Sequence, residues 1–370
     1  MDDVLANITL AASLPLRFHI IVRSSDPVLD FGSLAPHMLR ATHFTLESDD
    51  QLTLSRLHQS FKGISGPLLR HFALFFRRDR QNTPRDCTPL LPRSWFSGQL
   101  QALEVLHVCC AAMPFADLHL PALRVFRMWG VHRQYSIDFR TLSGVICNSP
   151  LLQDVSLRRF TCTGLRSFDT LPVLRSTSVR TLELGFPCDG SLGRLASLFE
   201  FPSLSDLLLE ISTLGHVRQT ELLRPQLLAT VASLTISNPS ARSVPFDFPY
   251  THLFLLFPCL RALDLSLSHP RVFADLVLTS SLHFRAHAVA LLPRLASLTV
   301  NHTGMRDLYE FASCYPVDLA LGHPCVSLSR IRAVFGVDVP HGPPTMDEAA
   351  ASSWLASNVL HFDVHTFSSP

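Results

Sequence analysis

A short phrase of apolar and polar positions recurs along the chain. It opens with a proline and continues apolar-x-x-apolar-x-apolar, as in residues 258–265, PCLRALDL. Alternation of apolar and polar residues over such a length predicts a short, half-buried β-strand. The proline lacks an amide donor and disfavours helix in the residue before it, so it marks where a helix ends and a strand begins. Copies occur at 67–74, 121–128, 150–157, 202–209 and 293–300.

The first apolar residue of each unit marks ten units in all. Nine intervals cover the 254 residues between the first and the last mark, about 28 each, within the leucine-rich-repeat range of about 20–29. A doubly wound sheet also alternates strands and helices, but it lacks a strand phrase at a steady interval. The ten marks are Ala41, Leu69, Leu100, Leu123, Leu152, Val179, Leu204, Val231, Leu260 and Leu295.

Between the strands the apolar spacing changes from two to about 3.6, which predicts helices. In the clearest case Phe139, Leu142, Val145 and Ile146 share one helical face, with Asp138 as the expected N-cap. Further helices are expected at 52–61, 189–199, 220–229 and 271–292.

We therefore predict an α/β fold, a leucine-rich-repeat-like right-handed solenoid (horseshoe) with one parallel strand per repeat and outer helices. Residues 1–325 are expected to form this solenoid, with about ten to eleven irregular repeats, and residues 326–370 a C-terminal capping segment. Within the capping segment we expect a helix at 327–335, a second helix opened by the capping-box spacing of Thr345 and Glu348, and a last strand at 360–367. Residues 79–98 are expected to form an exposed loop.

If the apolar positions fill the core, the positions between them face the concave side of the sheet. That surface is mixed and mildly acidic, which suits a protein or peptide partner better than a polyanion. Trp129 beside Arg127 is a candidate hot spot, with packing of Trp129 against a neighbouring loop as the alternative. The expected partner-binding residues are Glu104, Arg127, Trp129, Ser156, Arg158, Glu183, Glu210, Thr235, Asp264 and Thr299.

The composition limits which classes of function and which cellular compartment we expect for this protein. With 47% hydrophobic and 16% charged residues, the chain of 370 residues is expected to be ordered around a large core. A net charge of +1 gives no basic excess for nucleic acid. The N-terminus is acidic where a signal peptide is basic, and no run approaches the roughly 18 apolar residues of a membrane helix. With nine scattered cysteines and no C-x-x-C, we expect an intracellular protein, cytoplasmic or nuclear and not secreted.

The sequence lacks the signatures of catalytic and cofactor sites. It contains no G-x-S-x-G, no G-x-x-x-x-G-K-[ST] and no G-x-G-x-x-G. The pairs His283/His287 and His361/His365 have a spacing of four, but neither brings the third ligand that a metal site needs. We expect a non-enzymatic protein without a metal or cofactor.

Three segments resemble a known family: 13–20 (SLPLRFHI), 36–46 (PHMLRATHFTL) and 91–106 (LPRSWFSGQLQALEVL). They are similar to segments of the F-box and leucine-rich-repeat-like proteins of basidiomycete fungi. The first twelve residues, MDDVLANITLAA, are not an F-box, so the chain resembles the substrate-recognition region of such a ubiquitin-ligase receptor without its adaptor-binding module.

The resemblance implies an unknown protein partner, joined by cullin-type ubiquitin-ligase components if an F-box lies upstream. The alternative is a stand-alone repeat scaffold with no ubiquitin link. Lys62 is the single lysine. Such scarcity fits a protein that works beside ubiquitin-transfer machinery, and it also fits the codon bias of a GC-rich genome.

Overall fold

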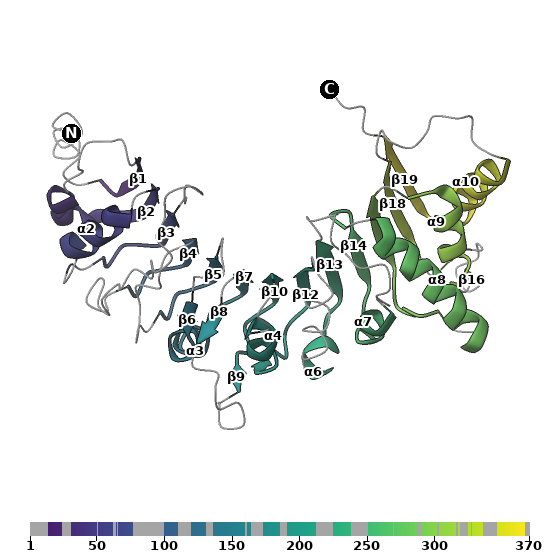
Figure 1. The fold of residues 1–370 in the computed structure, drawn as a ribbon, viewed down its shortest axis with the longest axis horizontal. Coiled ribbons are helices and arrows are strands. Elements are labelled where there is room, and N and C mark those ends of the chain that lie inside the picture. The colour runs from purple at the N-terminus through teal and green to yellow at the C-terminus, as the bar shows by residue number, and fades with distance from the viewer. Residues whose placement is uncertain are drawn as a thin grey trace. The chain divides into compact units, whose positions relative to one another are not determined.

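The structure is a computed structural model, drawn in Figure 1. It describes residues 14–23, 31–49, 51–61, 64, 66–76, 100–109, 120–130, 136–159, 161–163, 173–185, 191–211, 225–237, 251–268, 270–287, 290–301, 303–315, 317–318, 325–326, 328–335 and 346–366. The chain divides into two compact units, Met1–Ser203 and Leu204–Pro370.

Seven strands of the first unit lie in a parallel sheet. Each of the seven is hydrogen-bonded to the one that follows it among these seven along the chain. Equivalent residues of neighbouring repeats therefore lie side by side, as the repeated phrase predicts. The strands are β1 (Leu16–Val22), β2 (Ala41–Ser48), β3 (His71–Phe76), β4 (Val105–Cys109), β5 (Val125–Trp129), β7 (Asp154–Arg158) and β10 (Thr181–Gly185).

Six strands of the second unit are also parallel and follow chain order. They are β12 (Asp206–Glu210), β13 (Ser233–Ser237), β14 (Ala262–Leu265), β15 (Ser297–Asn301), β18 (Arg330–Phe335) and β19 (His361–Thr366). With thirteen strands in parallel sheet and helices between many of them, the described residues have an α/β fold.

Helices connect several of the strands. The first unit contains η1 (Phe31–Ser33), η2 (Ala35–Arg40), α2 (Gln51–Phe61), α3 (Phe139–Cys147) and α4 (Ser191–Ala196). The second unit contains α6 (Pro225–Leu228), α7 (Thr251–Leu255), α8 (Pro270–His287), α9 (Met305–Ala312) and α10 (Met346–Asn358). The helices expected at 52–61 and 138–146 are confirmed, and those expected at 189–199 and 271–292 end earlier, at Ala196 and His287. Of the helix expected at 220–229, the first five residues lie outside the described residues, and α6 ends at Leu228. Asp138 has the extended backbone of an N-cap, but its side chain makes no capping hydrogen bond.

Short strand pairs complete the described elements. In the first unit β6 (Ser136–Asp138) pairs with β8 (Thr161–Thr163), and β9 (Leu174–Arg175) pairs with β11 (Phe199–Glu200). In the second unit β16 (Val317–Asp318) pairs with β17 (Cys325–Val326) and is antiparallel to it. None of the helices in the described part of the chain is long and apolar enough to cross a membrane.

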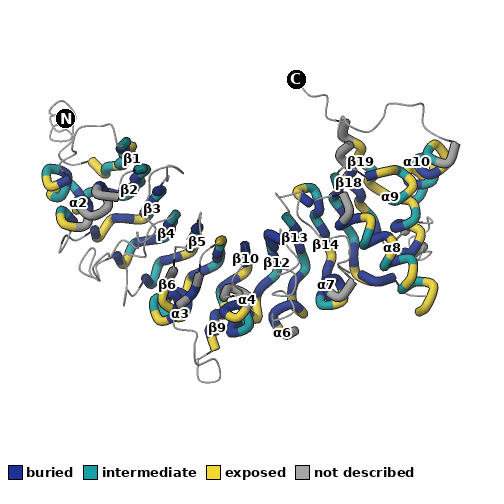
Figure 2. The backbone as a smooth tube through the Cα atoms, viewed as in Figure 1, coloured by how far each residue is buried: buried dark blue, intermediate teal, exposed yellow. Residues whose placement is uncertain are grey.

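The core lies between each unit's strands and its helices, where the strands are buried in Figure 2. Phe44 of β2 stacks on Phe72 of β3 with 5.6 Å between ring centroids, and it meets Phe61 of α2 edge-on at 5.3 Å. Burying such a side chain is worth about 1.5–3 kcal/mol. The second unit repeats the arrangement with aliphatic residues: Leu207, Leu234, Leu263, Leu298 and Ile331 are all buried.

The C-terminal region differs from one expectation. Residues 330–335, expected to be helical, form strand β18, and Ile331 lies beside Leu298 of β15. Ile331 and Ala333 are buried while Arg330 and Arg332 are exposed, so the real period is two. The expected last strand is confirmed as β19, and α10 begins at Met346, next to the expected capping box. The segment 326–370, assigned to a cap, thus holds two strands that continue the parallel sheet of the second unit.

Candidate partner-binding site

The sheet of the first unit has a side opposite to its core. Successive strand residues point to opposite faces, so Thr45 and Glu47 point away from the side on which Phe44 meets α2. Figure 1 shows α2, α3 and α4 on the core side of the first unit's strands. The outward positions of β2, β3, β4, β5, β7 and β10 are called the first open face below.

Strand register arranges the first open face in three rows across the strands. The middle row is Thr45, Ala73, His107, Arg127, Ser156 and Glu183. One side of it carries Glu47, Phe75, Cys109, Trp129, Arg158 and Gly185, and the other carries His43, His71, Val105, Val125, Asp154 and Thr181. Neighbouring strands lie about 4.8 Å apart, so residues that are distant in sequence form one continuous surface.

A closed network holds Trp129 in place at one end of this surface. Its indole Nε1 donates to the Ser156 hydroxyl at 3.2 Å, and that hydroxyl donates to Glu183 Oε2 at 2.5 Å. Arg158 is ion-paired with Glu183 and places its guanidinium 5.3 Å from the centre of the Trp129 ring. Hydrogen bond, ion pair and cation–π contact therefore support one another, and the charge of Arg158 is compensated inside the network.

Three histidines form a second cluster. The rings of His43 and His71 stack at 5.6 Å, His71 meets His107 edge-on at 5.4 Å, and Phe75 meets His107 at 6.4 Å. Because a cationic imidazole is poorly solvated here, burial lowers all three pKa values.

Neighbouring cations lower these pKa values further. After burial, Arg17 and Arg70 lower the pKa of His43, and the positive form of His43 lowers that of His71. Burial, then Arg127 and His71, lower the pKa of His107 to about 4. The His107 imidazole is neutral at pH 7, and within the described residues its buried Nε2 has no hydrogen-bond partner.

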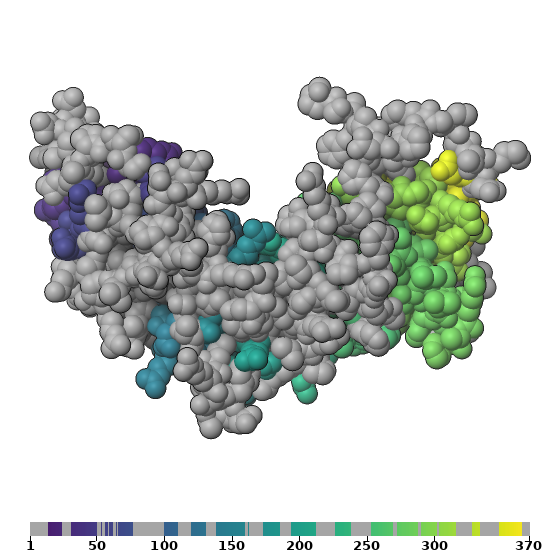
Figure 3. All heavy atoms as spheres, viewed as in Figure 1, coloured from purple at the N-terminus to yellow at the C-terminus, as the bar shows by residue number. Residues whose placement is uncertain are grey.

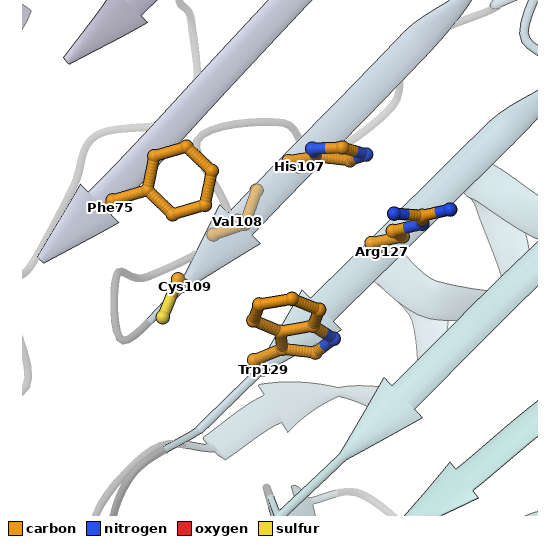
Figure 4. A pocket seen from close by; sticks show the side chains of 6 residues that line it. All are labelled: Phe75, His107, Val108, Cys109, Arg127 and Trp129. Carbon is orange, nitrogen blue, oxygen red and sulfur yellow. The ribbon is translucent and has the colours of Figure 1, made fainter. Parts of the chain in front are cut away.

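A small hollow lies between the Trp129 network and the histidines. Its empty space measures about 170 Å³ and includes open solvent. The residues that line it are Phe75, His107, Val108, Cys109, Arg127 and Trp129. In Figure 4 the Phe75 and Trp129 rings lie on either side of Cys109, and His107 and Arg127 lie toward the other end. The hollow is far smaller than the pockets that hold small molecules, so it offers a partner a shallow contact surface between side chains.

Five of the expected binding residues meet on this surface, and a sixth does not. Arg127, Trp129, Ser156, Arg158 and Glu183 lie on three adjacent strands. Glu104 was wrongly assigned to the same row, because it precedes β4 and its carbonyl accepts hydrogen bonds from the amides of Arg124 and Val125 at 2.8 and 3.0 Å.

His107 occupies the place beside Arg127 instead. Glu104 was misplaced because Leu100 was taken as the first apolar residue of this repeat. The register matches Leu103 with Leu123, since Leu106 pairs with Phe126. Leu100 and Leu103 are both fully buried, so their apolar character does not distinguish them.

The remaining expected residues belong to the second unit. Thr235, Asp264 and Thr299 are in register on β13, β14 and β15. The carboxylate of Asp264 accepts a hydrogen bond from the amide of Ser266 at 2.8 Å, which fixes the end of its own strand. Glu210 is only 7% exposed and offers little surface to a partner.

Sequence reasoning missed the histidine cluster, although part of its signal was present. His43 and His71 both stand two residues after a mark, Ala41 and Leu69, so aligning the copies places them side by side. His107 was hidden by the misplaced mark at Leu100. Phe75 lies two positions after Ala73 on β3, so it belongs to the same open face.

A groove in the second unit has a different character. Its lining includes Leu278 and Leu282 of α8 and Asp307 and Glu310 of α9, helices that reach the molecular surface in Figure 3. The leucines are 61% and 56% exposed. Burial, followed by the charge of Glu310, raises the pKa of Asp307, while Glu310 itself is bound by Arg306 at 3.1 Å. The groove thus combines exposed leucines with acidic side chains.

Metal-binding clusters were also considered. Within the described ranges, no group of three or more His, Cys, Asp or Glu side chains is placed to hold a metal ion. The rings of His283 and His287 on α8 lie 4.6 Å apart, but a pair alone does not form a metal site.

Fold and surface together define an α/β protein with parallel sheet, one side of which carries a Trp–Ser–Glu–Arg network, a histidine cluster and an exposed arginine. No protein-family model matches the chain, and neither does any curated protein.

Proposed function

We propose that this chain is a leucine-rich-repeat-like solenoid that acts as a non-enzymatic protein-interaction module. The steady interval of the strand phrase supports the repeat assignment, as does the chain-order pairing of strands within each unit. In repeat arrays each unit buries its apolar side against its neighbours and leaves the other side available for binding.

We further propose the first open face as the binding surface. The Trp129 network is the observation that carries this proposal, because it places a rigid aromatic side chain and an arginine beside a hollow. Tryptophan, tyrosine and arginine dominate binding hot spots. Side chains that are already held in place lose little conformational entropy when a partner binds.

The charge distribution favours a protein partner over a polyanion. The arginines Arg127 and Arg158 are interspersed with Glu47, Asp154 and Glu183 on the three rows. A nucleic-acid backbone needs a continuous basic surface, whereas protein interfaces place charges of both signs opposite complementary charges.

Resemblance to the F-box and leucine-rich-repeat-like proteins supports a more specific role, recognition of substrates for ubiquitination. The alternative role is that of a repeat scaffold without any link to ubiquitin. Recovery of a cullin-complex adaptor together with the protein favours the first role, and partners recovered without such an adaptor favour the second.

The binding surface is tested by pull-down from fungal extract with quantitative mass spectrometry. We expect Trp129→Ala to lose partners that the wild-type chain recovers, because it removes the aromatic centre of the surface. The matched control is the double substitution Ser233→Ala and Ser297→Ala in the second unit, which should retain them. If Trp129→Ala retains every partner, the first open face is not the binding surface.

A further inference from the structure

Arg127 differs from two other arginines of the first unit in having no partner among the described residues. Arg158 is paired with Glu183, and Arg70 lies 3.6 Å from Glu104. Arg127 is exposed and forms neither a hydrogen bond nor an ion pair with any described residue. Its guanidinium can therefore receive a bidentate carboxylate without breaking an existing interaction.

The wall of the hollow beside Arg127 is largely apolar. Phe75 and Trp129 face it from β3 and β5, and Val108 and Cys109 line it from β4 between them. The indole is held by Ser156 and covered by Arg158. A bulky apolar side chain of a partner would contact two aromatic rings here without having to displace a charge.

We propose that the partner presents an acidic residue two positions away from a bulky apolar residue in an extended segment, where alternate side chains point to the same face. Its carboxylate pairs with Arg127, and its apolar side chain lies between Phe75 and Trp129. This inference rests on the proposed function, and it specifies the chemistry of the partner.

Neighbouring charges favour this partner over a phosphate chain. Glu47 is the register partner of Phe75, and Asp154 is that of Val125, the residue two positions before Arg127. Glu183 is already engaged by Arg158. One carboxylate fits between these acidic groups, whereas a run of phosphates would meet repulsion on both sides.

The test begins with display selection of random peptides on the full chain. We expect the enriched peptides to carry Asp or Glu two positions away from Leu, Ile, Met, Phe or Trp. Binding of one enriched peptide is then measured by fluorescence anisotropy. We expect about a tenfold or greater loss of affinity for Arg127→Glu, and a similar loss when the peptide's acid is changed to its amide, because each removes the charged pair.

Two variants control for charge and geometry. Arg261→Glu, at an exposed arginine of the second unit that precedes β14, changes the net charge equally and should alter affinity less than about twofold. Arg127→Lys keeps the charge but loses the fork geometry, so it should bind with intermediate affinity. Arg127 is exposed, so Arg127→Glu should alter the free energy of unfolding by only about 0.5 kcal/mol, measured by urea denaturation.

The inference is overturned if no peptide is enriched, if the enriched peptides lack acidic residues, or if Arg127→Glu binds them as well as the wild type. Such a result leaves the binding surface intact as long as Trp129→Ala loses the partners recovered by pull-down. Retention of every partner by Trp129→Ala refutes the surface itself, so the two failures are distinguishable.

Discussion

The two units share one buried design, but the first open face differs from the corresponding side of β13, β14 and β15 in the second unit. In both, Leu, Ile, Val and Phe side chains of the strands are buried against the helices. The first open face carries large side chains, among them Phe75, His107, Arg127 and Trp129. On the corresponding side of β13, β14 and β15 the residues are small and mostly polar: Ser233, Thr235, Ala262, Asp264, Ser297 and Thr299.

This difference shows at which strand positions the repeated phrase allows the residue type to vary. Apolar positions are constrained because a repeat cannot bury its own core without its neighbours. The positions between them need only suit a strand. Threonine does so through its β-branched side chain, as at Thr235 and Thr299. Large residues there need a support of their own, which Trp129 obtains from Ser156 and Arg158.

The largest effect tests whether the two cores are equivalent. Phe126 in the first unit and Leu263 in the second are 0% and 1% exposed. We expect Phe126→Ala to lower the free energy of unfolding by about 3–5 kcal/mol and Leu263→Ala by about 2–5 kcal/mol, because each leaves a cavity. Urea denaturation followed by circular dichroism measures both. A cost below about 1 kcal/mol in one unit would mean that its core is loosely packed.

An intermediate effect should separate the two open faces. Glu183→Gln removes the charge that compensates Arg158, whose side chain is 34% exposed, and we expect a loss of about 2 kcal/mol in stability. Asp264→Asn in the second unit changes a local hydrogen bond to Ser266, and we expect less than about 1 kcal/mol.

The double substitution Arg158→Met with Glu183→Gln provides the control. It removes both charges, so it should recover part of the stability lost in Glu183→Gln alone. If Glu183→Gln and Asp264→Asn lower the free energy of unfolding equally, the Trp129 network does not stabilise the first open face more than a local hydrogen bond stabilises the second unit.

The smallest effect concerns pH. The folded pKa of His107 is about 4, below its ordinary 6.5, so between these values the unfolded chain binds more protons than the folded one. Stability is therefore fully retained above pH 6.5 and falls as the pH is lowered toward 4. Because His107 is only partly buried, screening by solvent should keep the total loss below about 1 kcal/mol. The charged or titratable groups that face His107 are Arg127 on β5 and His71 on β3.

His107→Gln should flatten this part of the pH profile, measured by urea denaturation at pH steps from 7 to 4. Because His43 and His71 also have lowered pKa values, we expect the variant to remove part of the slope and to leave the rest. An unchanged slope would contradict the assignment of the acid sensitivity to this cluster.

Much of this fold follows from local pattern. The alternation in the repeated phrase predicted which strand residues are buried, as Leu263 and Leu265 show. The prediction of strand positions from this alternation was wrong where two apolar patterns overlap. Leu100 and Leu103 are both apolar and three residues apart, and either one begins a plausible phrase. Residues 327–335 have several apolar residues, but the preceding proline, Pro324, lies four residues before Leu328 and not two as in the repeated phrase. Their alternation was therefore mistaken for a helical period.

The binding residues were predictable only in part, for the same reason. Trp129, Ser156 and Glu183 lie in well-marked repeats, so their positions on the strand were evident. Their mutual contacts depend on the lengths and directions of side chains from neighbouring strands. The lowered pKa of His107 depends on burial and on Arg127, neither of which is a property of its own segment.

The sequence by itself determined the alternation of buried and exposed positions, the chain order of the repeats and the absence of known catalytic motifs. Only the tertiary structure decided that His107, and not Glu104, lies beside Arg127. The physical reason is that register is set by the hydrogen bonds between strands and by the packing of Leu106 beside Phe126. These interactions join residues of different repeats, so they select one of two locally equivalent phrases.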